Sequence, residues 1–172
     1  MSQSPSVSAS RRRFLRGRVA APKAPSAFRP PWTNELRLSE HCTSCGACVD
    51  ACETSIISIG PDKKPGLSFM QGECTFCQAC VTACAEPVFN LGQLAPWRLG
   101  VLIGDGCLLK AGITCQLCTD HCDARALRFD LRVSPSGAIQ IDQDACSGCG
   151  ACVAPCPASA IDMINPQGEA GS

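Results

Sequence analysis

The sequence predicts an α+β protein made of two tandem units of the same construction, and three observations lead to that prediction. The 16 cysteines of the 172-residue chain fall into four runs of four, which group as two pairs. Short β-like segments bracket the runs, and short Ala-rich segments compatible with helices lie within them. Large side chains are scarce, with no Tyr, two Trp and six Phe, so bound metal rather than a large apolar core is expected to hold each unit together.

The spacing of the cysteines predicts iron–sulfur clusters. Three runs have the spacing CxxCxxCxxxC, and Pro157 follows the last of them; this is the bacterial-type pattern for [4Fe–4S] clusters. The third run differs because seven residues separate Cys107 from Cys115, an insertion that a loop tolerates at small entropic cost. No cysteine lies outside a run, which strengthens the cluster interpretation. The candidate ligands are Cys42, Cys45, Cys48, Cys52, Cys74, Cys77, Cys80, Cys84, Cys107, Cys115, Cys118, Cys122, Cys146, Cys149, Cys152 and Cys156.

We expect four cubes, two in each unit, with ligands exchanged between runs. In two-cluster proteins of this type the fourth cysteine of each run ligates the other cluster. An alternative stays open for the third run, in which Cys107 is not a ligand and the site holds a three-iron cluster. The expected sets are Cys42, Cys45, Cys48 with Cys84 (first set), Cys74, Cys77, Cys80 with Cys52 (second set), Cys107, Cys115, Cys118 with Cys156 (third set), and Cys146, Cys149, Cys152 with Cys122 (fourth set).

The predicted secondary structure alternates strand, ligand loop, helix and strand, twice in each unit. This order is that of a ferredoxin-like unit with internal pseudo-symmetry, and two such units account for the chain. The predicted helices cover residues 47–52 and 151–156. The predicted strands cover residues 56–59, 67–69, 88–91, 99–103, 126–129, 138–141 and 160–163. The predicted domains are a first unit at 34–93, a linker at 94–99, a second unit at 100–164 and a tail at 165–172.

Residues 1–33 differ from the rest in composition. They carry seven basic residues and no acidic one, whereas the remainder carries eight basic and fifteen acidic residues. We expect this segment to be mostly disordered, and either to fold back, to bind an acidic partner or to be a solvated tail. Residues 10–16 (SRRRFLR) look like a twin-arginine export motif. Arg18, Pro22, Lys23 and Pro25 interrupt the apolar stretch that a cleaved signal needs, so a retained segment is expected.

Several function classes lack a signal in this sequence. There is no CxxCH for covalent haem, no GxGxxG opening a helix and no Walker loop. We expect no catalytic residue, since every thiol is assigned as a ligand, and no nucleic-acid partner. No apolar stretch reaches the roughly 18 residues of a membrane span, so the protein is expected to be soluble and, with its thiols free for metal, to lie in a reducing compartment.

Motifs spread along most of the chain carry a family resemblance. They are residues 10–13 (SRRR), 29–32 (RPPW), 41–43 (HCT), 74–80 (CTFCQAC) and 103–108 (IGDGCL), together with the long gap after Cys107 and the closing Cys156 and Pro157. With these motifs the chain resembles the NapF family, the ferredoxin-type accessory proteins of the periplasmic nitrate reductase system. One departure is Ala85, which follows Cys84 where ferredoxin runs usually have Pro.

The resemblance implies a cytoplasmic protein without substrate turnover of its own. It would contact the catalytic molybdenum subunit of the periplasmic nitrate reductase before that subunit is exported, and would assist its maturation or supply it with electrons. Two alternatives stay open at this point. One is an electron-transfer subunit of a membrane-associated oxidoreductase, and the other is a structural metal-binding module in which zinc fills the cysteine sets; zinc sites, however, generally join two separated CxxC pairs.

Overall fold

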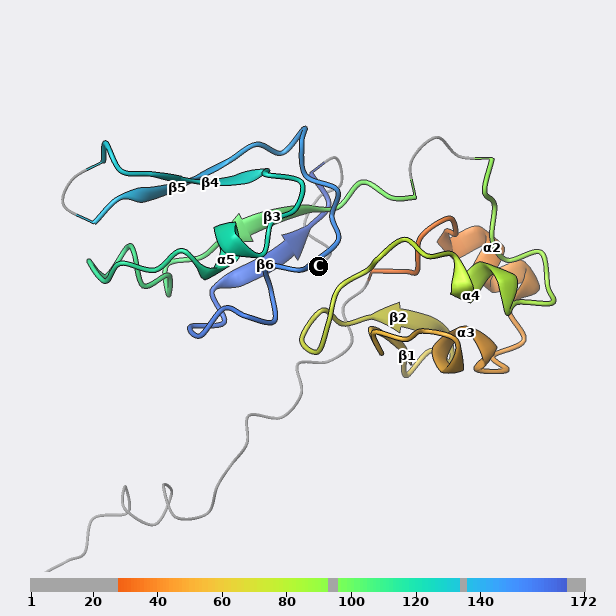
Figure 1. Ribbon diagram of the computed structural model, residues 1–172. Coiled ribbons are helices and arrows are strands. Elements are labelled where there is room, and N and C mark those ends of the chain that lie inside the picture. Colours follow the sequence, from red (N-terminus) through yellow and green to blue (C-terminus); the bar gives the residue numbers. More distant parts are fainter. Residues whose placement is uncertain (1–27, 93–95, 134–135, 167–172) are drawn as a thin grey trace, which may run out of the picture.

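The computed structural model describes residues 28–92, 96–133 and 136–166, which form two lobes (Figure 1). The first lobe holds α2 (Glu35–His41), α3 (Ala47–Asp50), β1 (Ile57–Ile59), β2 (Pro65–Leu67) and α4 (Ala79–Thr82). The second holds β3 (Gly100–Ile103), α5 (Leu117–Asp120), β4 (Leu127–Asp130), β5 (Ala138–Ile141) and β6 (Ile161–Ile164). The elements of the first lobe lie between residues 35 and 82, and those of the second between residues 100 and 164. The export-like motif at residues 10–16 and the tail from residue 167 lie outside the described residues.

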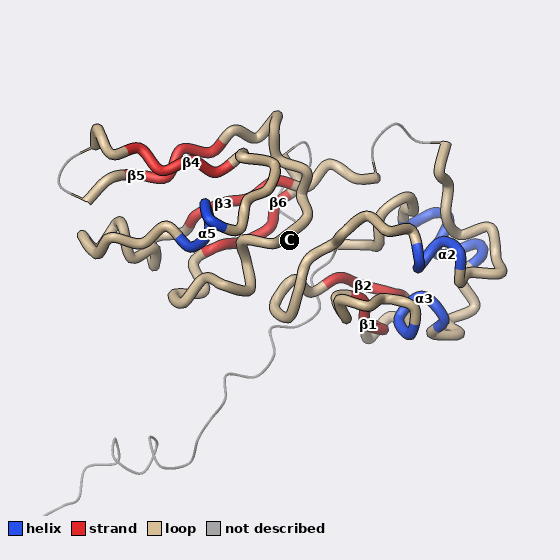
Figure 2. Tube along the Cα trace, viewed as in Figure 1, coloured by secondary structure: helices blue, strands red, loops and turns tan. Residues whose placement is uncertain are grey.

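The second unit has two antiparallel strand pairs, one inside the other along the chain (Figure 2). β4 and β5 form a hairpin in which Leu127 pairs with Ile141, and β3 pairs with β6 so that Gly100 faces Ile164. These four strands confirm the predicted strands to within a residue. The β3–β6 ladder joins the beginning of the unit to its end.

The first unit has the inner hairpin but lacks the outer pair among its described residues. β1 and β2 pair with Ile57 opposite Leu67, and β2 begins two residues before the predicted strand at 67–69. Its first residue is Pro65. Proline has no N–H to donate to a ladder, so within sheets it is tolerated at positions such as the first residue of a strand. The predicted strand at 88–91 is wrong, since the structure has no strand there.

Side chains take the place of the missing ladder in the first unit. Pro30 and Pro31 have no N–H groups, so the segment before α2 is a poor ladder partner. The guanidinium of Arg37 donates instead to the carbonyl oxygens of Pro87, Val88 and Phe89. The Thr33 hydroxyl also donates to the Val88 carbonyl, at 3.0 Å.

Residues 28–33, which composition assigns to the disordered tail, are part of the first unit. The Leu67 N–H donates to the Phe28 carbonyl at 3.0 Å, and the Asn90 N–H donates to the Trp32 carbonyl at 2.6 Å. Trp32 is 7% exposed. The packed structure therefore includes residues before the predicted boundary at 33.

The helices are short, and a proline explains why one of the predicted helices does not form. The predicted helix at 47–52 ends at Asp50, and the predicted helix at 151–156 is a series of turns. In α3 the Ala51 N–H donates to the Ala47 carbonyl at 3.1 Å. Pro155 occupies the position of Ala51 in the fourth run and has no N–H for that bond. Helix α2 was not predicted from the sequence, although Asn34 caps it by accepting from the Arg37 N–H at 2.9 Å.

The core is small and includes cysteines. One buried cluster comprises Ile56, Ile57, Leu67, Phe69, Cys80 and Leu99, and the other comprises Val101, Leu127, Cys152 and Ile161. Leu99 packs into the first cluster although it precedes β3 of the second unit. In the part of the chain that the structure describes, no helix has the length and apolar character to cross a membrane.

Candidate iron–sulfur sites

Three cavities in the structure are each bordered by four cysteines. In every case three of them come from one run and the fourth comes from the paired run. The first cavity has an empty volume of about 380 Å³, the second about 420 Å³ and the third about 370 Å³, each including open solvent. They are lined by the cysteines of the first set (Cys42, Cys45, Cys48, Cys84), the second set (Cys52, Cys74, Cys77, Cys80) and the third set (Cys107, Cys115, Cys118, Cys156).

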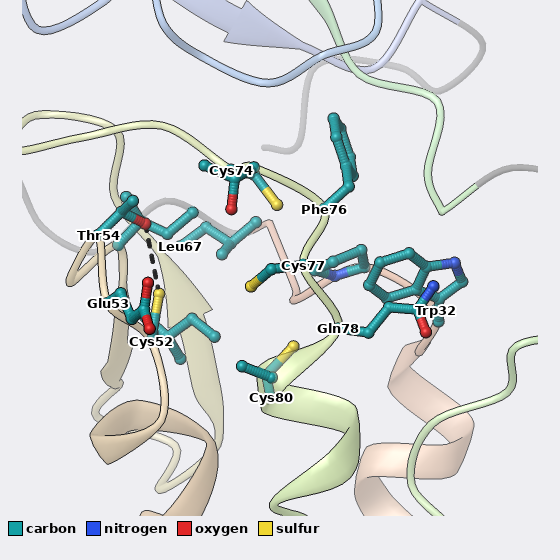
Figure 3. Close-up of a pocket in the computed structure, with 15 residues that line it drawn as sticks. Trp32, Cys52, Glu53, Thr54, Leu67, Cys74, Phe76, Cys77, Gln78 and Cys80 are labelled. Carbon is teal, nitrogen blue, oxygen red and sulfur yellow. Dashed lines mark hydrogen bonds between the residues drawn. The ribbon is translucent and has the colours of Figure 1, made fainter.

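The second cavity shows the arrangement directly (Figure 3). Cys77 and Cys80 lie on the loop and first turn of α4, and Cys52 reaches the same space from the end of the first run. The Cys52 sulfur also contacts the Thr54 hydroxyl at 3.5 Å. Trp32 and Phe76 also line this cavity, with their ring centroids 6.5 Å apart.

The fourth set is brought together around a buried cysteine. Cys152 is 6% exposed, and Cys122 and Cys146 pack against the same core cluster. The pKa of Cys146 is raised, chiefly by burial and to a smaller extent by nearby Cys149 and Cys122. Cys122 accepts a hydrogen bond from the Leu127 N–H at 3.4 Å, which fixes its sulfur at the start of β4. The structure thus places the cysteines of the fourth set near one another.

The loops of the first, second and fourth runs share one backbone feature. The second cysteine of each run is the middle one of the three that share a loop and is called the middle cysteine below. A residue with positive φ, between +55° and +84°, lies on each side of it. Such alternation turns successive N–H groups toward one side and forms a concavity that binds anions, including the sulfur atoms of iron–sulfur sites. The residues concerned are Ser44 and Gly46, Phe76 and Gln78, and Gly148 and Gly150.

This geometry affects the middle cysteines of the first two runs. The Ala47 N–H and then the Thr43 hydroxyl lower the pKa of Cys45 by hydrogen bonding to its sulfur. The Ala79 N–H and then the Thr75 hydroxyl do the same for the pKa of Cys77. A thiolate is the form of cysteine that binds metal, so these loops favour the ligating form.

The more buried cysteines have the opposite tendency. Burial raises the pKa of Cys48, Cys74, Cys80 and Cys118 to about 11, and that of Cys152 to about 12. Nearby cysteines add to the shift in each of them. A cationic iron centre would offset the cost of placing these thiolates together, and its binding would release their protons.

The third run reaches its cavity by another path. Gln116, which precedes α5, has φ of −136° rather than the positive φ of Gly46 or Gln78 before α3 and α4. The inserted residues form turns in which the Lys110 N–H donates to the Cys107 carbonyl at 3.0 Å. The pKa of Cys118 is raised by burial and next by Cys107. Cys107 is therefore close to the other cysteines of its set in spite of the long gap.

The donor set and the cavities fit cubic clusters. A cube offers one iron corner to each of four thiolates, so its ligands must surround a space instead of meeting at a point. The cysteines surround such spaces, and across the described ranges no three Cys, His, Asp or Glu side chains converge closely enough for a single metal ion. The residues that would hold the four clusters are the four cysteine sets.

Comparison with known proteins agrees with this geometry. The pattern of the 4Fe-4S dicluster domain matches residues 41–88 and 113–160. The ferredoxin-type protein NapF of Escherichia coli K12 is 41% identical over 156 residues, which are 90% of this chain and 94% of that protein. The chain belongs to the NapF family of ferredoxin-type proteins. NapF of Haemophilus influenzae is 40% identical over 162 residues, 89% of this chain and 92% of that protein.

A more distant relative is the methylamine utilization ferredoxin-type protein MauM of Methylophilus methylotrophus. It is 30% identical over 153 residues, 78% of this chain and 68% of that protein. The family resemblance predicted from the sequence is thus confirmed, and with it an iron–sulfur protein that carries [4Fe–4S] clusters.

The aromatic residues beside the second set of this NapF-family chain were not predicted from the sequence. Phe76 lies between two cysteines of the second run, and its ring centroid is 5.6 Å from that of Trp97. Trp97 contacts Phe69 in turn, at 6.1 Å. Phe76 was visible as the one aromatic residue inside a CxxC spacing, but the partners of its ring come from distant parts of the chain, which spacing cannot reveal.

Proposed function

We propose that this protein binds four [4Fe–4S] clusters through the four cysteine sets and acts in the cytoplasm as an accessory protein of the periplasmic nitrate reductase. In this role it assists the maturation of the catalytic molybdenum subunit, or supplies it with electrons, before export. The clusters supply one-electron oxidation and reduction when bound. The chain itself turns over no substrate.

The observation that carries the proposal is the ligand exchange between paired runs. Each cavity takes three cysteines from one run and one from the other, which is the arrangement that two-cluster ferredoxins use. Support for the nitrate reductase partner comes from the relatives named NapF, which match this chain over nearly their whole length.

Besides binding the metal, the cysteines connect the two halves of each unit. Cys84 follows α4 but belongs to the cavity of the first run, and Cys52 follows α3 but belongs to that of the second. The cysteine that follows each of these two short helices therefore lines the cavity of the other run. Loss of one ligand is expected to disturb both sites of a unit, because binding energy at such sites is also folding energy.

Metal content is the first test of the proposal. Protein purified and reconstituted without oxygen should contain about sixteen iron atoms and a similar amount of acid-labile sulfide, four of each per cube. It should also absorb visible light. A colourless protein containing zinc would overturn the proposal in favour of a structural zinc module.

Partner binding and electron supply are tested with matched ligand variants. Cys45→Ala and Cys149→Ala change the middle cysteine of one run in each unit, and both should retain fewer clusters than the native chain. Affinity capture of the unexported catalytic subunit and nitrate reductase activity are then measured for each variant. Activity lost with capture retained indicates electron supply, whereas loss of both indicates that the clusters maintain the docking surface. No capture by the native, fully loaded protein would contradict the nitrate reductase role.

A further inference from the structure

The loops of the second and fourth runs contact each other across the boundary between the two units. The Cys74 N–H donates to the Cys149 carbonyl oxygen at 2.8 Å. The Trp97 indole N–H donates to the Ser147 carbonyl oxygen at 3.1 Å. Both bonds reach the loop that carries the fourth run, and one of them starts from a cysteine of the second set.

Two glycines allow this approach. Gly148 and Gly150 flank Cys149, with φ of +73° and +80°. A Cβ atom on Gly150 would lie 2.1 Å from the Phe69 ring, and one on Gly148 would lie 2.7 Å from the Leu99 carbonyl oxygen. Since real Cβ atoms do not come so close to other atoms, only glycine fits at either position.

The first run provides the contrast. Gly46 occupies the position of Gly150 in its own run and has nearly the same φ, +84°. A Cβ atom on Gly46 would meet nothing within 4 Å. The requirement for glycine at position 150 therefore has two parts, the positive φ that both share and the contact with Phe69 that only Gly150 makes.

Each of the three cavities lies within a single unit, and the second is lined only by residues between Pro31 and Cys80. The first cavity is lined only by residues between Cys42 and Phe89, and the third only by residues between Ile103 and Ile161. Within each unit, two sets are interlocked by the exchanged cysteines. The contact between Cys74 and Cys149 thus connects the second set to the fourth.

We propose that Gly150 and Phe69 are positioning residues that hold the second and fourth cysteine sets against each other, so that the four sites form one series in the order first, second, fourth, third. The inference rests on the cluster ligands of the proposed function. In this series the first and third sets are the ends, where an electron would enter or leave, and the contact at Phe69 connects the two pairs.

The test compares Gly150→Ala with Gly46→Ala in the fully loaded chain. Both variants place a methyl group at a residue with positive φ, but only Gly150→Ala meets Phe69. Iron content is measured first. A native chain that binds no iron would refute the proposed function, whereas the contact itself is tested by comparing the two variants. Amide exchange of the peptide containing Cys74, by mass spectrometry, then reports the hydrogen bond to Cys149. The EPR spectrum of the reduced protein reports magnetic interaction between neighbouring clusters.

In Gly150→Ala, exchange at Cys74 should rise on the order of tenfold, because opening of the contact becomes easier, and the EPR signal should lose its broadening from interaction between the units. Gly46→Ala should resemble the native chain in both measurements. Equal behaviour of the two variants would overturn the proposal, as would a native EPR signal that Gly150→Ala leaves unchanged.

A variant of Phe69 separates the ring contact from backbone strain and guards against a simple folding failure. In a Phe69→Ala background the ring is gone, so adding Gly150→Ala should change exchange at Cys74 by no more than about twofold. If Gly150→Ala has the same effect with and without the Phe69 ring, the contact does not position the sets and the proposal fails.

Discussion

The two units carry the same arrangement of cysteines but are closed in different ways. The second unit joins its ends by the β3–β6 ladder, in which Val101 pairs with Met163. The first unit joins its ends mainly through side chains, with Arg37 of α2 donating to three successive carbonyls at residues 87–89, and adds only backbone bonds at Trp32, whose carbonyl accepts from the Asn90 N–H and whose N–H donates to the Pro96 carbonyl. Both solutions satisfy backbone groups that would otherwise be left without partners.

The ligand framework therefore does not require a complete sheet. Pro30 and Pro31 before α2 lack the N–H donors that a ladder needs, and Arg37 of the added helix supplies hydrogen bonds in place of the ladder. The strand pair depends on many small contributions, whereas the arginine closure depends on few residues. The first unit should therefore respond more strongly to single substitutions in its closing segment.

The largest effect is expected from Leu38→Ala in α2. Leu38 has no exposed surface, so its removal leaves a cavity and should lower the free energy of unfolding by about 2–5 kcal/mol. Leu36→Ala on the same helix is the control, because Leu36 is 63% exposed; its effect should stay within about 0.5 kcal/mol. Thermal unfolding of the loaded protein without oxygen, followed by circular dichroism, measures both. Equal losses would show that α2 does not pack on the first unit.

Arg37→Ala should have the next largest effect. It leaves the carbonyls of Pro87, Val88 and Phe89 without their charged donor, at a cost of about 1–3 kcal/mol. Arg37→Lys keeps the charge but not the planar fork, and should recover only part of that loss. Arg128→Ala in the second unit is the control, since Arg128 makes one exposed bond to the Arg125 carbonyl. Full recovery by lysine would show that charge rather than hydrogen bonding closes the unit.

Gln143→Ala tests the closure of the second unit. The Gln143 side-chain amide donates to the Val101 carbonyl at 2.7 Å, and its oxygen accepts from the Val101 N–H at 3.4 Å. Loss of these bonds at the edge of β3 should cost about 1 kcal/mol, which is less than the effect of Arg37→Ala because the ladder to β6 remains. The same unfolding measurement applies. A loss as large as that of Arg37→Ala would contradict the idea that the ladder makes this unit more tolerant.

The sequence predicted what depends on local patterns, and it missed what depends on contacts between distant residues. The cysteine spacing was enough to anticipate which cysteines share a cavity, because in two-cluster proteins with this spacing the fourth cysteine of each run ligates the other cluster. Residues 138–141 alternate and are flanked by turn residues, so their strand was predicted to the residue. The segment at 88–91 has the same strand-like composition, but no local pattern shows that Arg37 takes its carbonyls.

The inter-unit contact lay beyond sequence reasoning for the same reason. Gly148 and Gly150 look alike beside their cysteine, and Gly46 looks like Gly150 in the first run. Only the position of Phe69, 81 residues away along the chain from Gly150, distinguishes the constrained glycine from the unconstrained one. The boundary at residue 33 was placed by composition, which sees the charge of the tail and not the burial of Trp32.

The smallest expected effect is a pH dependence in the first unit. Arg29 donates to Glu35 at 2.6 Å and to Asp62 at 2.5 Å, linking the segment before α2 to the β1–β2 turn. The hydrogen bond from Arg29, followed by one from the Lys64 N–H, holds the pKa of Asp62 below its usual value. Because the folded pKa is depressed, this interaction stabilises the protein above the unfolded value of about 3.9, and the stabilisation is lost as pH falls through the lower folded value.

Asp62→Asn should therefore melt at a slightly lower temperature than the native chain at neutral pH, and the difference should shrink as the pH is lowered below about 4. The difference between variants is measured at each pH, so that acid effects on the clusters cancel. Asp105→Asn in the second unit is the control. The pKa of Asp105 is also lowered, by a hydrogen bond from Lys110, but these residues are five apart and can pair in the unfolded chain as well. A pH-dependent difference as large for Asp105→Asn would show that the link from Arg29 to Asp62 adds nothing beyond a local ion pair.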